Sequence, residues 1–204
     1  MSDPIRLVIV DDQAMLRGAL LALLELEDDL TVVATAGDGA EAVSAVAEHR
    51  PDVCLMDIQM PGMDGIEATT AVLEAAPGTR VLIVTTFARP GYLRSALDAG
   101  ASGFVVKDAP AEQLADAVRR VHQGLRVVDP KLAEASLFDG ANPLSEREQQ
   151  VLRLAADGRS AASIAAEVFL SAGTVRNNLS SAIGKCAASN RAQAVRIAQD
   201  KGWI

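Results

Sequence analysis

The sequence has little of what marks a redox, metal-thiolate or disulfide-rich protein. Its 204 residues include two cysteines and two histidines, and only 3% are aromatic. Cys54 and Cys186 lie far apart in apolar surroundings, which predicts buried thiols in a reducing compartment rather than a disulfide or a metal site. His49 and His122 belong to no cluster with ligand spacing. Because aromatics are so scarce, alanine, valine and leucine must fill the cores.

Long hydrophobic runs are also missing. No apolar run reaches the length of a membrane span. The N-terminal segment meets acidic residues directly after a short apolar run, which is not the pattern of a signal peptide. These observations predict a cytoplasmic protein.

The net charge of −8 is unevenly distributed along the chain. Residues 1–142 hold 11 Lys/Arg against 22 Asp/Glu, which gives 11 − 22 = −11, whereas residues 143–204 hold 8 against 5, which gives 8 − 5 = +3. This asymmetry indicates two modules with different partners. A surplus of +3 does not by itself establish DNA binding.

Short apolar runs alternate with helical patterns over the first module. Strands are expected at 5–10, 30–36, 53–56, 81–84 and 103–106. Helices are expected at 14–27, 40–49, 66–76, 90–99 and 111–123. This alternation predicts a doubly wound, flavodoxin-like α/β fold, with a five-stranded parallel sheet in the order 2-1-3-4-5 and helices on both faces.

The first module is organised around the stretch 52–65, DVCLMDIQMPGMDG. Its apolar run stops at Asp57, and the turn residues Pro61 and Gly62 follow. A buried parallel strand that ends in this way places the Asp57 carboxylate at the carboxyl edge of the sheet, where open α/β sheets bind their ligands. An isolated Asp at such a position is more often a cap for the next turn.

Polar residues that end the other strands favour a binding site instead. They are Asp11, Asp12, Thr85 and Lys107. In the order 2-1-3-4-5 these residues converge with Asp57, and three carboxylates in one place favour a divalent cation such as Mg²⁺. A carboxylate beside Mg²⁺ can attack a phosphoryl group, while a lysine and a hydroxyl bind the phosphoryl oxygens.

Residues 4–123 resemble the receiver domain of two-component response regulators. The matching motifs are VDD (10–12), DIQMPGMDG (57–65), VTT (84–86) and GASGFVVKDA (100–109). Each motif is weak alone, but the four at this spacing are highly specific. The resemblance implies that Asp57 accepts a phosphoryl group from a sensor histidine kinase.

The same resemblance assigns roles to the neighbouring residues. Asp12 and Asp57, with the Gln59 carbonyl, would hold Mg²⁺, and Asp11 would act mainly through a bound water. Lys107 would pair with the phosphate. The switch pair would be Thr85, which moves to the phosphate, and Phe104, which turns inward.

Ordinary explanations exist for three of these residues. Lys107 can be a solvated lysine after a strand, Phe104 a core aromatic, and Thr85 a residue chosen for its strand propensity. The presence of the full set favours the functional roles.

The regular pattern weakens between the two modules. Residues 125–142 are expected to form a linker between a receiver domain at 1–124 and a second domain at 143–204, with a helical turn or two near 131–137.

The second module reads as four short helices. Ser145 and Glu148 have the spacing of a capping box, and Ser160 and Asn190 are further expected helix caps. A tight connection between the second and third helices predicts an all-α helix-turn-helix domain.

The third helix, expected at 172–186, has two faces. Val175, Leu179, Ile183 and Cys186 recur at helical spacing and should face the core. The opposite face carries Arg176 and other polar residues that suit base edges and phosphates in a major groove. The candidate DNA-binding residues are Ser171, Thr174, Arg176, Asn177, Asn178, Ser180, Ser181, Lys185 and Arg191. An ordinary amphipathic surface helix would show a similar pattern.

Residues 143–204 resemble the LuxR-type helix-turn-helix of the NarL/FixJ regulators. The matching segments are LSEREQQVLRLAADG (144–158), IAAEVFLSAGTVRNNLSSAIGK (164–185) and NRAQAVRIA (190–198). The terminal KGWI is similar to a subset that includes the DesR-like regulators of membrane-lipid desaturation.

The second module departs from this family at several positions. Residues 161–163 are Ala-Ala-Ser where members often have Asn-Lys-Glu, residues 185–191 differ from the usual Lys-Leu-Gly-x-x-Asn-Arg, and Ser180 stands where some members have a base-reading lysine. Fewer cations predict a shallow salt dependence and weak binding by a monomer, so dimerisation should matter.

The two resemblances together imply a transcription regulator rather than an enzyme. Phosphorylation of Asp57 would drive homodimerisation and binding to promoter double-stranded DNA. Helices 14–27 and 111–123 would supply a dimer face or would simply pack on the sheet. Two alternatives are a regulator that binds DNA without phosphate and an Asp-nucleophile phosphatase, for which the sequence offers no cap segment.

Overall fold

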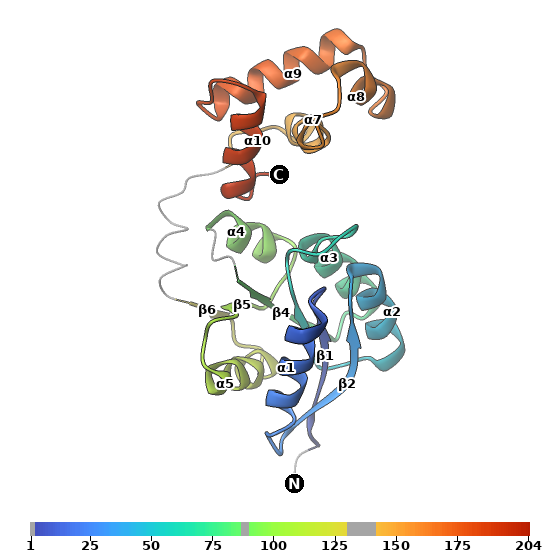
Figure 1. Ribbon diagram of the computed structural model, residues 1–204. Coiled ribbons are helices and arrows are strands. Elements are labelled where there is room, and N and C mark those ends of the chain that lie inside the picture. The colour runs from blue at the N-terminus through green and yellow to red at the C-terminus, as the bar shows by residue number, and fades with distance from the viewer. Residues whose placement is uncertain (1–2, 87–89, 130–141) are drawn as a thin grey trace. The chain divides into compact units, whose positions relative to one another are not determined.

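The computed structural model describes residues 3–86, 90–129 and 142–204 (Figure 1). The chain divides into two compact units, one built on a β-sheet and one built on helices. The helical turn predicted near 131–137 lies outside the described residues. Within the described ranges, no helix is both long and apolar enough to cross a lipid bilayer.

The sheet unit alternates strands and helices as predicted. Its strands are β1 Ile5–Val10, β2 Leu30–Ala36, β3 Val53–Met56, β4 Arg80–Thr85, β5 Gly103–Val106 and β6 Val127–Val128. Its helices are α1 Ala14–Leu24, α2 Gly39–His49, α3 Gly65–Ala75, α4 Pro90–Asp98 and α5 Ala111–His122.

The sheet has six parallel strands in the order β2-β1-β3-β4-β5-β6. The predicted order 2-1-3-4-5 is confirmed, whereas the predicted number of five strands is wrong. β6 is only two residues long, too short for a periodic pattern, and it lies in the segment that was expected to be linker. Tertiary pairing of Val127 with Gly103 makes it a strand.

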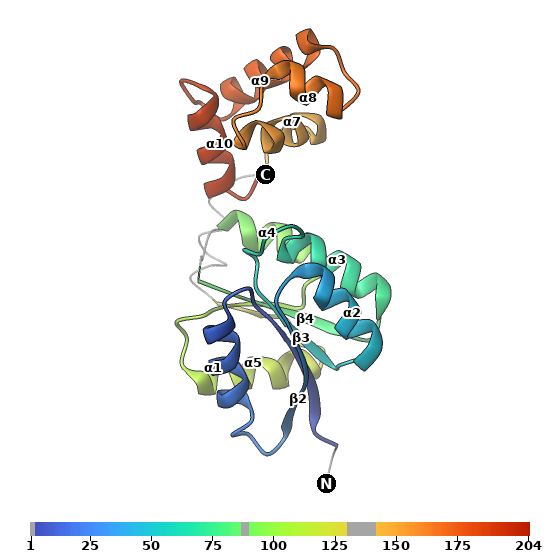
Figure 2. The ribbon, with the colours of Figure 1, turned by 45° about the vertical axis from the view of Figure 1, so that its right-hand side comes forward.

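Helices cover both faces of the sheet. α1 and α5 lie on one side, and α2 and α3 lie on the other (Figure 2). Alternate strand residues, such as Leu55 and Val84, join the α1 and α5 core, while Cys54, Ile83 and Phe104 between them point the other way and are also fully buried. Phe104 is the largest fully buried side chain.

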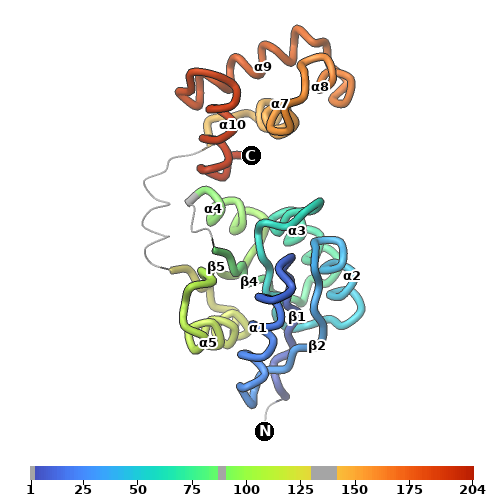
Figure 3. Tube along the Cα trace, in the orientation of Figure 1, coloured from blue at the N-terminus to red at the C-terminus, as the bar shows by residue number. Residues whose placement is uncertain are grey.

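The chain runs outward from β1 to β2 and then returns past β1 to β3 (Figure 3). This reversal is a topological switch point, and it brings the carboxyl ends of β1 and β3 side by side. Val10 pairs with Met56 at these ends, so Asp11 and Asp57 follow at the same level of the sheet.

The first helix is shorter than the sequence pattern suggested. It ends at Leu24 rather than near residue 27, and Glu25 caps it by donating its backbone N–H to the Leu21 and Leu23 carbonyls. The chain then turns toward β2 through the hydrogen bond from the Leu30 N–H to the Glu27 carbonyl. Leu26, which lies in this turn rather than in the helix, is 78% exposed.

The second unit consists of α7 Glu146–Ala156, α8 Ala161–Glu167, α9 Ala172–Lys185 and α10 Arg191–Asp200. The predicted caps are confirmed: Ser145 and Glu148 form a complete capping box, and the side chains of Ser160 and Asn190 accept backbone hydrogen bonds at the starts of α8 and α10. A separate apolar core joins all four helices.

Candidate functional site

Backbone hydrogen bonds fix the residues that end the central strands. The Asp11 N–H donates to the Ala36 carbonyl at 3.1 Å, and the Asp57 N–H donates to the Val10 carbonyl at 3.0 Å. The Lys107 N–H donates to the Thr85 carbonyl at 2.8 Å. The sheet therefore carries these three side chains to one edge with little freedom in their backbone positions.

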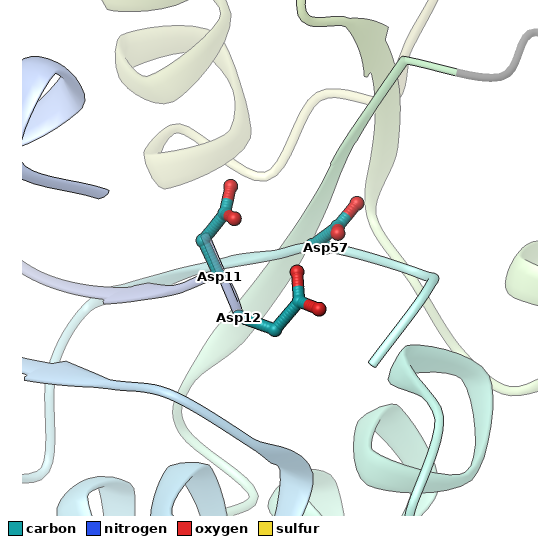
Figure 4. A group of neighbouring side chains, drawn as sticks. All are labelled: Asp11, Asp12 and Asp57. Atoms are coloured by element: carbon teal, nitrogen blue, oxygen red, sulfur yellow. The ribbon is translucent and has the colours of Figure 1, made fainter. Parts of the chain in front are cut away.

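Three carboxylates gather at this edge. One oxygen from each of Asp11, Asp12 and Asp57 lies within 4.8 Å of the others (Figure 4). Asp11 and Asp57 are buried, whereas Asp12 is exposed. The cluster is thus open to solvent on the Asp12 side.

Lys107 bridges the two buried acids. Its Nζ lies 2.7 Å from Asp11 Oδ2 and 3.1 Å from Asp57 Oδ1, and all three side chains are at most 4% exposed. These contacts are ion pairs that lack the alignment of directed hydrogen bonds. The ammonium therefore holds the two acids by charge.

Burial raises the pKa of the Asp57 carboxyl, and the nearby charge of Lys107 only partly offsets this effect. Asp11 Oδ1 accepts a hydrogen bond of 2.9 Å from the Gln13 N–H, and Asp11 Oδ2 faces Lys107. A cation at the site would offset the penalty that burial imposes on the charged form of Asp57.

The loop after β3 brings Gly65 against Asp57. A Cβ at Gly65 would lie 1.8 Å from the Asp57 carbonyl oxygen, so only glycine fits there. The Gly65 N–H donates to the Ile58 carbonyl at 2.9 Å. Sequence reasoning had treated Gly65 only as a turn residue; no local signal distinguishes a close approach from a turn.

The expected switch residues occupy neighbouring strands. Thr85 ends β4 and is fully buried, and Phe104 lies in β5 with its side chain fully buried. Phe104 pairs in register with Ile83, so alternation places Phe104 and Thr85 on the same face of the sheet. Gln59 lies exposed in the loop after Asp57.

The predicted DNA-binding residues lie on or beside α9, and they fall into groups with different surroundings. Arg176, Asn177 and Ser180 are exposed. On the buried side, Val175, Leu179 and Cys186 face the core as predicted, but Ile183 is only half-buried, because Ala182 takes the fully buried position.

Several of the other candidates bind within the domain. Ser171 caps α9 by accepting from the Thr174 N–H at 3.0 Å, and the Asn178 amide donates to the Thr174 carbonyl at 2.9 Å. The Arg191 guanidinium donates to the Arg159 carbonyl at 2.7 Å.

Ser181 and Lys185 both contact Glu148 of α7. The Ser181 hydroxyl lies 2.6 Å from Glu148 Oε1, and Lys185 Nζ lies 2.7 Å from Glu148 Oε2. Sequence reasoning had assigned Glu148 only to the capping box, because helical periodicity within α7 does not show which side chains of another helix it meets.

Comparison with protein families agrees with both units. Residues 7–119 match the response regulator receiver domain, and residues 142–198 match the bacterial regulatory proteins of the luxR family. The chain belongs to the two-component response regulators. Its domain pair is of the NarL/FixJ type.

Individual relatives cover the whole of this response regulator. The transcriptional regulatory protein YvfU of Bacillus subtilis is 48% identical over 98% of the chain and 100% of its own length. The transcriptional regulatory protein DesR of the same organism is 46% identical over 98% of the chain and 99% of its own length. Among solved structures, the response regulator ChrA of a heme-sensing two-component system has a TM-score of 0.59 at 36% identity, with both chains covered completely.

Proposed function

We propose that this response regulator accepts a phosphoryl group on Asp57 from a sensor histidine kinase, and that the modified form dimerises and binds promoter double-stranded DNA in the cytoplasm. The observation that carries this proposal is the buried Asp57 carboxylate, held 3.1 Å from Lys107 within a group of three acids.

The charge of the cluster fits a divalent cation. Three ionised carboxylates and one lysine give −3 + 1 = −2, which a single Mg²⁺ neutralises. Carboxylate oxygens with one side open to water are the ligands that Mg²⁺ prefers. Asp12 and Asp57 would hold the ion with the Gln59 carbonyl, and Asp11 would reach it through water. When bound, the ion supplies charge neutralisation for the phosphoryl oxygens.

The chain's own residues account for the transfer. An oxygen of the Asp57 carboxylate attacks the phosphorus of the phosphohistidine, the new O–P bond forms, and the P–N bond breaks as the electron pair leaves with the imidazole. Lys107 needs only to re-aim its ammonium from the Asp57 carboxylate to the new phosphoryl oxygens. Thr85 then hydrogen-bonds the phosphoryl group through its hydroxyl.

Exposed apolar side chains on α1 support a dimer face. Leu20 and Leu24 of α1 pack on the sheet, but Met15 is 89% exposed and Leu23 is 43% exposed. Packing on the sheet therefore explains the apolar side chains on only one side of this helix. The other side, with the adjacent α5, would pack against a second copy.

The DNA-binding surface in this proposal is the exposed face of α9. Arg176 and Asn177 can each make bidentate contacts with base edges, and the hydroxyl of Ser180 extends the same face. Ser171 and Thr174 lie at the start of the helix, where phosphate contacts are common.

Treatment with a small phosphodonor and Mg²⁺ tests the proposal, with intact mass and sedimentation as readouts. We expect one added phosphoryl group and a shift from monomer to dimer in the wild type, and neither change in Asp57→Asn. A wild-type chain that gains no phosphoryl group yet already sediments as a dimer would favour the phosphate-independent regulator. The observation that supports this alternative is Phe104, which is already fully buried, whereas in the proposed switch it turns inward after phosphorylation.

A further inference from the structure

Glu148 is one of the few buried charged residues of the described chain, at 5% exposure, and it lies far from the phosphoacceptor cluster in sequence. Its carboxylate accepts hydrogen bonds from donors at the start of α7 and on α9. The Ser145 N–H donates to Oε2 at 2.6 Å from the start of α7 itself. The Ser181 hydroxyl and the Lys185 ammonium donate from α9 at 2.6 and 2.7 Å.

The geometry of these bonds restricts how α9 can move. Ser181 and Lys185 are four residues apart, so they lie one turn apart on the same side of the helix. The Glu148 carboxylate thus binds α9 at two points, and the capping box with Ser145 fixes the position of the carboxylate itself. A rotation of α9 about its axis, or a slide along it, breaks both bonds together.

This arrangement reduces the positive charge that Lys185 can present to a DNA phosphate. Its ammonium is already neutralised by a buried carboxylate, which pairs with no other cation among the described residues. A phosphate contact that drew the ammonium away from Glu148 would leave this buried carboxylate without its cation. The only other cation in the sequence of α9 is Arg176, which is exposed.

We propose that Glu148 is a positioning residue for DNA binding, which sets the rotation and register of the recognition helix α9 by binding Ser181 and Lys185, so that these two residues act inside the domain rather than as DNA contacts. This inference rests on the proposed DNA-binding function. It removes Ser181 and Lys185 from the surface that contacts DNA. α9 then reads DNA through Arg176 and neutral polar side chains.

The salt dependence of DNA binding separates the two roles of Lys185. A lysine that neutralises a phosphate releases counterions, so its loss makes the negative slope of log K against log salt shallower by about 0.9. A lysine that only holds α9 in place leaves this slope unchanged, and its loss weakens binding by a similar factor at every salt concentration.

The experiment uses the full-length chain, treated with the small phosphodonor and Mg²⁺, and a fluorescent duplex of mixed sequence, titrated over a range of salt concentrations. The variants are Lys185→Met, Glu148→Gln and the double variant. Arg176→Met is the positive control for a phosphate or base contact, and Arg153→Met is the matched loss of one exposed charge on α7. Ser181→Ala removes one bond and keeps all charges, so it remains informative if a charge variant unfolds.

We expect Lys185→Met and Glu148→Gln each to weaken binding several-fold with the wild-type salt slope and to lower the melting temperature of the second domain. The double variant should lose no more than the worse single variant, because both remove the same interaction. Ser181→Ala should show the same effects to a smaller extent.

Two outcomes would overturn the inference. One is a salt slope that is shallower by about 0.9 in Lys185→Met but unchanged in Glu148→Gln, since that would identify Lys185 as a phosphate contact. The other is additive losses in the double variant. A wild-type chain that binds no duplex at any salt concentration would instead refute the proposed DNA-binding function, while the melting data would still report on the Glu148 contacts.

Discussion

The ammonium nitrogen of Lys107 lies 3.1 Å from a carboxylate oxygen of Asp57, and both side chains are almost completely buried. They come from strands that are not adjacent, β5 and β3, with β4 between them. The pair therefore depends on the correct assembly of three strands. It also holds the Asp57 oxygen that we propose as phosphoacceptor beside its charge partner before any phosphoryl group arrives.

Lys107→Met should destabilise the receiver domain in the absence of divalent cations. Loss of the ammonium leaves Asp11 and Asp57 buried without a charge partner, which costs about 3 kcal/mol of unfolding free energy. Mg²⁺ should restore part of this loss, because it neutralises the same carboxylates. Chemical unfolding with and without Mg²⁺ measures both effects. Arg120→Met, which removes a half-exposed cation of α5, should change neither, and equal losses in the two variants would argue against the bridge.

Gly65→Ala should disrupt the proposed phosphoacceptor site. The added Cβ would collide with the Asp57 carbonyl oxygen, so the loop after β3 must shift and take Asp57 with it. We expect a loss of more than about 2 kcal/mol in unfolding free energy and little phosphorylation by a small phosphodonor. Gly78→Ala is the control, because nothing lies within 4 Å of a Cβ at that glycine. Normal phosphorylation of Gly65→Ala would show that the loop adapts.

The stability of the second domain should decrease at acidic pH because of Glu148. Burial alone would raise the pKa of this carboxyl, but the hydrogen bonds from Lys185, Ser181 and Ser145 outweigh burial and hold the pKa at about 2, below the ordinary 4.5. A lowered folded-state pKa means that the unfolded chain binds the proton more readily, so the stabilisation is complete above about pH 4.5 and is lost as the pH falls toward 2.

This contribution amounts to at most about 3 kcal/mol, and less after solvent screening of the half-exposed Lys185. Thermal melting of the second domain at pH values from neutral to acidic measures it. Glu148→Gln should melt at a lower temperature near neutral pH and should show a flatter acid dependence than the wild type. Parallel pH curves for the two proteins would contradict the assignment.

Phe169→Gly should stabilise the second domain. Phe169 lies in the turn between α8 and α9 with φ of 54°, a left-handed conformation that costs a bulky residue about 1 kcal/mol, and its side chain is 94% exposed. Glycine adopts this conformation without strain, so the melting temperature should rise. Phe169→Ala removes the aromatic ring and keeps the strain, so it should not raise the melting temperature by as much. A lower melting temperature for glycine than for alanine would rule out strain as the cause.

Local patterns in the sequence predicted most of the secondary structure. The capping box at Ser145 and Glu148 was visible because both residues and the bond between them belong to one helical turn. The end of α1 was misjudged, because the chain turns toward β2 directly after Leu24 and leaves Leu26 exposed. β6 was missed because two valines carry no periodicity, and only pairing with β5 makes them a strand.

By itself, the sequence determined which residues end the strands and so which acids meet at the sheet edge, because parallel strands in a known order bring their carboxyl ends together. It also determined the four helices of the second domain and the apolar side of α9. Only the tertiary structure decided where individual side chains find their partners: Gly65 against the Asp57 carbonyl, Phe104 fully inside, and Lys185 on Glu148. The physical reason is that periodicity and caps act within one element, whereas the approach of two elements depends on how all the side chains between them pack.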